Sequence, residues 1–175
     1  HQRRGSAMIF TLIAILITIL LILLNGIFVA VEFAVVTSKK SKMQALAETG
    51  DRSARLALDL MKNLPLSISG AQLGITVTSL GLGLVAEPAF AKVIEHFITE
   101  PLGMPKALSH AIAFGFALFI VVFMHMVIGE MVPKNLALTT PETVLCKVAR
   151  PHRSFVILFR PVIWFLNKVS SLLLS

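Results

Sequence analysis

The residues with the clearest chemical potential are polar side chains inside long apolar segments. Glu130 closes one such segment and is followed at once by Pro133 and Lys134. A carboxylate inside a lipid-crossing helix is costly unless it faces a partner, water or a bound ion. Pro133 cannot donate a hydrogen bond to the carbonyl of Gly129 and clashes with it, so we expect this turn of helix to open beside the carboxylate. Such a pattern is typical of the broken-helix cation sites of transporters.

Further polar residues lie in the two apolar segments that come earlier in the chain. Asn25 and Glu32 are about two helical turns apart, which puts them on one face of a helix. Between residues 64 and 90, one helix face collects small and polar residues: Ser69, Gln72, Thr76, Ser79, Gly83 and Glu87. If the three polar faces converge, they form a pocket of oxygen ligands with a carboxylate, which is the kind of site a hard cation prefers.

Each of these features also has a purely structural explanation. Small residues such as Gly74 let membrane helices pack closely, and hydroxyl groups can bond carbonyls of their own helix. Glu32 is near Lys39 and Lys40 in the sequence and could form an ion pair at the membrane surface. His125 and Glu130 project from different sides of the same predicted helix, so we expect His125 to be a packed or interfacial histidine. The packing and the cation-binding explanations both stay open at this stage.

The elements that must position these residues are membrane-spanning helices. The chain is 56% hydrophobic and 14% charged, with a mean hydropathy of +0.86, well above what a soluble domain of this size shows. Residues 8–36, 64–90 and 108–136 are apolar and long enough to cross a hydrocarbon core about 30 Å thick. We predict an all-α integral membrane fold with three transmembrane helices, the second interrupted or built from a pair of short helices.

The distribution of charge orients these helices and excludes other functions. The net charge is +7, and most lysines and arginines lie in residues 38–63 and 141–175. By the positive-inside rule both segments are cytoplasmic, which places the N-terminus outside. Anchoring to the lipid bilayer surface explains these basic residues, and we predict no nucleic-acid partner. Cys146 is the only cysteine, which excludes an internal disulfide and a paired-cysteine metal site.

Amphipathic segments flank the predicted spans. Residues 38–63 have apolar residues at helical spacing on both sides of Gly50, which predicts two short helices at the cytoplasmic interface. Residues 141–175 combine prolines, basic residues and Trp164, and we predict amphipathic helices on the cytoplasmic leaflet, with a fourth crossing as the alternative. The sequence has no Ser-His-Asp set, paired catalytic acids, metalloprotease motif or phosphate-binding loop, so we do not expect an enzyme.

Three stretches together carry a family resemblance. They are FVAVEFAVVTSKKSKMQAL (residues 28–46), GAQLGITVTSLGLGLVAEPAF (residues 70–90) and GEMVPKNLAL (residues 129–138). In this order and spacing they resemble the transmembrane domain of the CorC/CNNM family, which includes the bacterial hemolysin-like CorC proteins. The resemblance covers essentially the whole chain after residues 1–7, which are typical of an expression-tag remnant.

The resemblance implies a homodimer in a bacterial or archaeal plasma (inner) membrane, with three spans and a belt of cytoplasmic juxtamembrane helices in each protomer. Family members transport Mg²⁺, outward and coupled to Na⁺. Longer members continue into cytoplasmic CBS domains that bind ATP, and residues 8–175 correspond to the membrane domain without them. Two alternatives stay open: transport of an organic cation such as a polyamine, and a dimeric membrane anchor or regulator without transport activity.

Residue by residue, Glu130 matches the acid of the family's third span, and Pro133 and Lys134 match its Pro-Lys pair. The chain departs from the family at Val29, where many relatives have a small Ser or Gly, and at Ile75, where many have Asn. Two oxygen ligands are thereby lost. Hydroxyls of Thr76 or Ser69, or freed backbone carbonyls, can substitute, and a looser, more hydrated site or a different cation fits the loss equally well. The predicted metal ligands are Glu130, Thr76, Ser69, Glu32 and Asn25, and the predicted gating or structural residues are Pro133, Lys134, Gly129 and Gly74.

Overall fold

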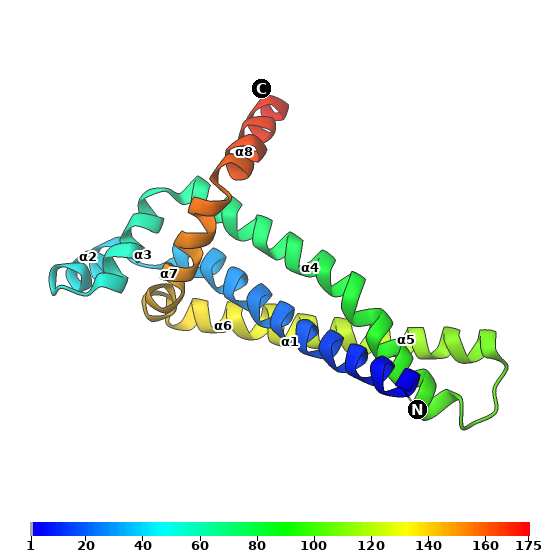
Figure 1. Ribbon diagram of the computed structural model, residues 1–175. Coiled ribbons are helices and arrows are strands. Elements are labelled where there is room, and N and C mark those ends of the chain that lie inside the picture. Colours follow the sequence, from blue (N-terminus) through cyan, green and yellow to red (C-terminus); the bar gives the residue numbers. More distant parts are fainter. Residues whose placement is uncertain (1) are drawn as a thin grey trace. The chain divides into compact units, whose positions relative to one another are not determined.

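The computed structural model describes residues 2–175, and every regular element within that range is a helix (Figure 1). His1, part of the predicted tag remnant, lies outside the described residues. Three helical stretches are long and apolar enough to cross a membrane: Arg3–Thr37, Leu64–Thr99 and Lys106–Thr139. The predicted all-α membrane fold with three spans is therefore confirmed, and each span is longer than hydropathy indicated.

The chain divides into two compact units. The first contains residues up to Leu24 together with Val77–Gly129, and the second contains Asn25–Thr76 together with Glu130–Ser175. Three helices contribute residues to both units: α1 (Gln2–Thr37), α4 (Leu64–Ile94) and the π-helix η2 (His125–Met131). Every other described helix belongs to one unit only.

The first unit is built on small side chains that let its helices pack closely. Beyond its shares of α1, α4 and η2 it contains η1 (Glu95–Thr99) and α5 (Lys106–Met124). Two buried clusters hold it together: Ile22, Leu82, Ala86 and Val121, and Ala91, Ile94, Ala113 and Ala117. Gly81 lets α4 approach α1, because a Cβ at that position would lie 3.2 Å from Leu21. Large apolar side chains cover the outward faces, as expected of surfaces that contact acyl chains.

The second unit packs short helices around one buried cluster. Its own helices are α2 (Lys40–Glu48), α3 (Arg52–Lys62), α6 (Val132–Thr139), α7 (Pro141–Leu158) and α8 (Arg160–Leu174). The cluster consists of Ala34, Val35, Met43, Ala47, Ala54, Ala57, Leu60, Ala137, Leu145 and Ala149. Because most of these side chains are methyl groups, the helix backbones can approach one another closely.

The two short helices predicted in residues 38–63 are present as α2 and α3. Gly50 has a φ of +96°, in the region that favours glycine, and it turns the chain between them. Asp51 then caps α3, because its carboxylate accepts hydrogen bonds from the backbone N–H groups of Ser53 and Ala54 at 2.9 and 3.4 Å. The capped helix packs against α7 within the second unit.

The third span has irregular backbone in its interior, whereas the second span has it only at its end, in η1. An interruption of the second span is predicted from the sequence, but α4 runs unbroken from Leu64 to Ile94 with Pro88 inside it. The third span instead contains η2, which ends shortly before Pro133. Pro133 is the second residue of α6, which follows η2 without a break, and its ring nitrogen has no N–H to donate to the turn before it. The predicted opening before Pro133 thus takes the form of a π-helical turn.

The last two helices meet at a bend of 77° between Leu158 and Arg160. By length and composition the pair could also count as one broken span. However, α7 carries Lys147, Arg150 and Arg153, all of them exposed, and charges exposed to lipid are costly. This distribution favours the predicted juxtamembrane position of α7 over a fourth crossing.

Candidate cation site

Glu130 lies in η2, inside the third candidate span, and is half-buried. A π-helical turn is rare and occurs frequently at functional sites. On the helix that follows, the Nζ atom of Lys134 lies 5.0 Å from the centre of the Phe33 ring, and this cation–π contact joins α6 to α1. Glu130 therefore lies in an irregular turn, directly before a helix that contacts α1.

Asn25 is fully buried on α1, where its amide would be costly without hydrogen bonds. One turn later, Phe28 covers Gly74 of α4, and a Cβ at Gly74 would lie 2.5 Å from the phenyl ring. Real Cβ atoms do not approach other atoms so closely, so glycine is required at this contact. Within the second unit, α1 and α4 thus meet closely next to the turn that carries Asn25.

The two predicted hydroxyl ligands have different surroundings. Ser69 is half-buried and donates a hydrogen bond to Oδ1 of Asn167 in α8 at 2.6 Å. Thr76 is exposed and donates to the carbonyl of Gln72 in its own helix at 2.8 Å. Each oxygen keeps acceptor capacity, but the two residues lie roughly 10 Å apart along the helix. A single ion bound to one chain can therefore contact at most one of these hydroxyls.

Glu32 is half-buried on α1, and the alternative explanation that it pairs with Lys39 or Lys40 is wrong. Among residues 2–175, the carboxylates that form ion pairs are those of other residues. The lysine-rich segment after α1 instead contacts Glu142 at the start of α7. Lys39 donates its backbone N–H to Oε1 of Glu142 at 3.1 Å, and Nζ of Lys42 lies 3.9 Å from Oε2. The chain turns after α1, so lysines close in sequence to Glu32 meet a different acid.

Glu142 is a buried acid that the sequence analysis missed. It is 6% exposed and is the second residue of α7. Burial alone would raise the pKa of its carboxyl, but the hydrogen bonds from the backbone N–H groups of Lys39 and of Glu142 itself, with the charges of Lys42 and Lys39, hold that pKa below its ordinary value. The ionised carboxylate therefore fixes the segment after α1 onto α7. The one signal in the sequence is Thr-Pro-Glu at 140–142, a typical helix start with an acid in the first turn.

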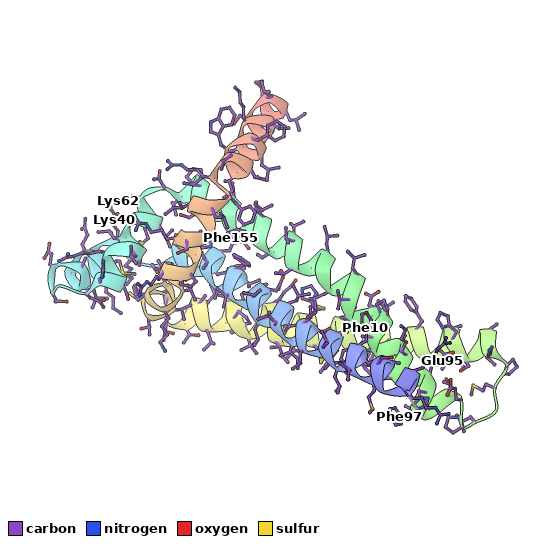
Figure 2. All side chains as sticks on the ribbon, in the orientation of Figure 1. Phe10, Lys40, Lys62, Glu95, Phe97 and Phe155 are labelled. Carbon is purple, nitrogen blue, oxygen red and sulfur yellow. The ribbon has the colours of Figure 1, made fainter. Side chains whose placement is uncertain are left out.

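His152 of α7 is a second buried titratable residue that the sequence analysis missed. It is 1% exposed, and its ring lies near Phe28 and Phe155, with centroids 6.1 and 6.4 Å away. Phe155, which is labelled in Figure 2, also contacts Phe28, with ring centroids 4.7 Å apart. The ring that covers Gly74 is thus part of an aromatic cluster shared by α1 and α7.

His125, at the start of η2, is half-buried, and its Nε2 atom lies 3.4 Å from Oγ of Ser79. This contact fits the expectation of a packed histidine. Within residues 2–175, no group of three or more His, Cys, Asp or Glu side chains could hold a metal ion. A cation near Glu130 would therefore have at most two such side chains as ligands, together with neutral oxygens and water.

Comparison with known proteins decides the family of this membrane domain. The family model described as the cyclin M transmembrane N-terminal domain, CNNM, matches residues 16–175. The chain belongs to the CNNM family. The resemblance to the CorC/CNNM family is thereby confirmed, and with three candidate spans this CNNM domain is a multi-pass membrane protein.

Curated bacterial relatives resemble the CNNM domain over most of its length. The chain is 42% identical over 153 residues to the UPF0053 protein YhdT of Bacillus subtilis, covering 87% of this chain and 33% of YhdT. It is 40% identical over 161 residues to the uncharacterized protein Rv1841c of Mycobacterium tuberculosis, covering 92% and 45%. It is 38% identical over 168 residues to the UPF0053 protein YugS of Bacillus subtilis, covering 96% and 38%. The chain thus spans less than half the length of these relatives.

Proposed function

We propose that the chain is the membrane domain of a Mg²⁺ transporter, which exports Mg²⁺ from the cytoplasm in exchange for Na⁺. The observation that carries this proposal is the half-buried carboxylate of Glu130 in a π-helical turn of the third span. An acid kept inside a membrane helix marks an ion or proton pathway by default. The protein acts as a homodimer in the plasma membrane with its N-terminus outside, an orientation that the basic cytoplasmic segments support.

The ligand set suits an ion that stays partly hydrated. Mg²⁺ requires about six oxygens in octahedral geometry and releases water reluctantly, so one or two protein carboxylates are the usual number. Glu130 supplies the formal charge, and the buried amide of Asn25 supplies a neutral oxygen. Val29 and Ile75 offer no side-chain oxygen, and water takes the places that these two residues leave. Ser69, Thr76 and Glu32 are the remaining candidate oxygen donors.

The residues around Glu130 suggest how the path opens. Gly129 is buried in η2 and Pro133 lies in the first turn of α6, so the backbone changes its hydrogen-bonding pattern between these two residues. Lys134 marks the cytoplasmic boundary through its contact with Phe33. Gly74 keeps α1 and α4 in close contact. In this proposal the π-helical turn is the gate, and cytoplasmic CBS domains that bind ATP, carried by the longer protein, control it.

Ligand-dependent thermal stability of the purified chain in detergent tests the binding part of the proposal. A ligand that binds only the folded state raises the melting temperature by mass action. We expect Mg²⁺ to raise the melting temperature of the parent, Glu130→Gln to abolish that rise, and the exposed control Glu100→Gln to keep it. A rise with spermidine but not with Mg²⁺ would replace the proposal by polyamine transport. No rise with either cation would favour a membrane anchor.

A further inference from the structure

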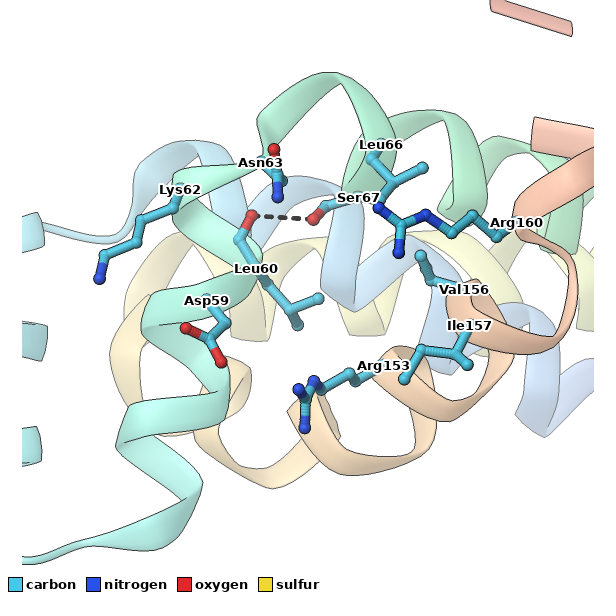
Figure 3. Close-up of a pocket in the computed structure, with 10 residues that line it drawn as sticks. All are labelled: Asp59, Leu60, Lys62, Asn63, Leu66, Ser67, Arg153, Val156, Ile157 and Arg160. Carbon is cyan, nitrogen blue, oxygen red and sulfur yellow. Dashed lines mark hydrogen bonds between the residues drawn. The ribbon is translucent and has the colours of Figure 1, made fainter. Parts of the chain in front are cut away.

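A pocket of about 300 Å³ lies where the first turn of α4 meets α3, the end of α7 and the start of α8 (Figure 3). All of its lining residues belong to the second unit. The lining combines cationic side chains with an apolar wall: Lys62, Arg153 and Arg160, and Leu66, Val156 and Ile157. A hollow with this composition offers charge and apolar contact to the same ligand.

Arg153 and Arg160 approach the pocket from the two sides of the bend between α7 and α8. Figure 3 shows Arg160 extending back over Val156 toward Leu66, whereas Arg153 extends toward Asp59. Neither arginine forms an ion pair with a carboxylate within residues 2–175. Three cations share the lining with one acid, Asp59, and the pocket therefore keeps an excess of positive charge.

The wall of the pocket is held in place by a hydrogen bond between α3 and α4. The hydroxyl of Ser67 donates to the carbonyl of Leu60 at 2.8 Å, across the junction of the two helices. Both residues line the pocket, and both are buried. The hollow therefore exists before any ligand binds, which lowers the entropic cost of binding.

The position along the chain puts the pocket at the edge of the membrane. The second candidate span begins at Leu64, between the pocket residues Asn63 and Leu66. Four residues after the pocket residue Arg160, α8 carries the exposed Trp164, whose ring lies 4.7 Å from Nζ of Lys168. Tryptophan and lysine are typical anchors at the level of lipid headgroups. A ligand at this depth meets headgroups on one side and acyl chains on the other.

A second hollow of about 350 Å³ adjoins the first and shares Arg153 and Ile157 with it. Arg52 of α3 and Arg150 of α7 also line this second hollow, whose lining contains no acid. The two hollows together thus present arginines from α3, α7 and α8 on one continuous surface.

We propose that the first pocket binds the phosphate of an anionic phospholipid, with Arg153 and Arg160 as its ligands. The planar guanidinium forms paired hydrogen bonds with phosphate oxygens, and basic pockets beside membrane helices on the cytoplasmic side bind anionic headgroups. The acyl chains lie along the apolar wall at Leu66 and Ile157. A lipid with two phosphates places the second phosphate in the adjoining hollow. This lipid site is separate from the proposed cation site and does not depend on it.

Lipid binding to the purified chain in an uncharged detergent tests the proposal. Native mass spectrometry and thermal melting are followed during titration with phosphatidylglycerol, with phosphatidylcholine and with inorganic phosphate. We expect phosphatidylglycerol to bind and to stabilise, and Arg153→Gln combined with Arg160→Gln to weaken its binding by at least about tenfold. Arg153→Lys combined with Arg160→Lys keeps the charge but loses the guanidinium fork, and should bind with intermediate strength.

A matched control removes two charges from exposed residues of the same helices that line neither hollow. Arg55→Gln combined with Lys147→Gln does this on α3 and α7, and should bind phosphatidylglycerol like the parent. The proposal is overturned if the control loses as much binding as the arginine variant, or if neither of them loses any. Equal stabilisation by inorganic phosphate alone would overturn the lipid as the ligand. If the double glutamine variant does not fold, the double lysine variant tests the proposal in its place. Parent-like binding of phosphatidylglycerol by the lysine variant would then contradict the proposal.

Discussion

The Nε2 atom of His152 in α7 lies 3.0 Å from the carbonyl oxygen of Ser67 in α4. Because a carbonyl can only accept, Nε2 carries the proton and His152 is the donor. The Nδ1 atom is also buried and has no hydrogen-bond partner among the described residues. Burial lowers the pKa of His152, although the bond to Ser67 opposes that effect. A neutral imidazole thus ties α7 to the first turns of α4.

We predict that stability falls when the pH drops below about 6.5, the ordinary pKa of histidine. Because burial lowers the pKa in the folded state, the unfolded chain binds the proton first. The loss therefore begins at the unfolded-state pKa and levels off below the folded-state pKa. His152→Gln keeps an amide N–H near the position of Nε2 but does not titrate. Its melting temperature should therefore change less than that of the parent between about pH 7.5 and about pH 5.5.

The matched control for this prediction is His110→Gln, which removes an exposed histidine. It should leave the contribution of His152 intact, so its melting temperature should still fall in acid. The melting temperatures of the parent, His152→Gln and His110→Gln are measured in detergent across this pH range. Parallel pH profiles for the parent and His152→Gln would show that this imidazole does not set the acid sensitivity.

Gly74→Ala is predicted to destabilise the protein by about 1 to 3 kcal/mol, because overpacking of a tight contact has this cost. The new Cβ would meet the Phe28 ring at 2.5 Å. Gly83→Ala is the control, since a Cβ there has no neighbour within 4 Å. Thermal melting should show a loss for Gly74→Ala, little change for the control, and partial recovery when Phe28→Leu is added. Equal melting temperatures for both alanine variants would contradict the packing role of Gly74.

Glu142→Ala is predicted to cost about 1 to 3 kcal/mol, because it leaves a backbone N–H of Lys39 without its acceptor. Glu142→Gln keeps an acceptor and should cost less, and the exposed control Glu48→Ala should cost little. The pKa of Glu142 is lowered in the folded state. Its stabilisation is therefore complete above the ordinary carboxyl pKa and is lost as the pH falls through the folded-state value. Equal losses for the alanine and glutamine variants would exclude the hydrogen bond as the cause.

The spans and the two short helices could be predicted because hydropathy, charge and glycine position act locally. Leu64–Thr99 begins at the residue that the apolar pattern indicates, and Gly50 turns the chain between α2 and α3 as expected. Each of these features depends on neighbours within a few residues, and a single sequence is enough to recognise them.

The contacts that hold the second unit together could not be predicted. His152 and Ser67 are far apart in the sequence, and no periodic pattern joins an imidazole to a particular carbonyl. The π-helical turn before Pro133 could not be predicted either. A proline can be preceded by an open turn or by a π-helical turn, and Pro133 alone does not determine which one forms. The position of Glu130 in the third span follows from hydropathy, whereas its neighbours depend on how the helices pack.

Mg²⁺ flux from proteoliposomes that contain the purified chain tests the central claim most directly, with a Na⁺ gradient as the driving force and a Mg²⁺-sensitive dye as the readout. The account predicts Na⁺-dependent Mg²⁺ movement with the parent and with Glu100→Gln, and none with Glu130→Gln. Parent-like Mg²⁺ flux through Glu130→Gln, or no flux through the parent, would contradict it.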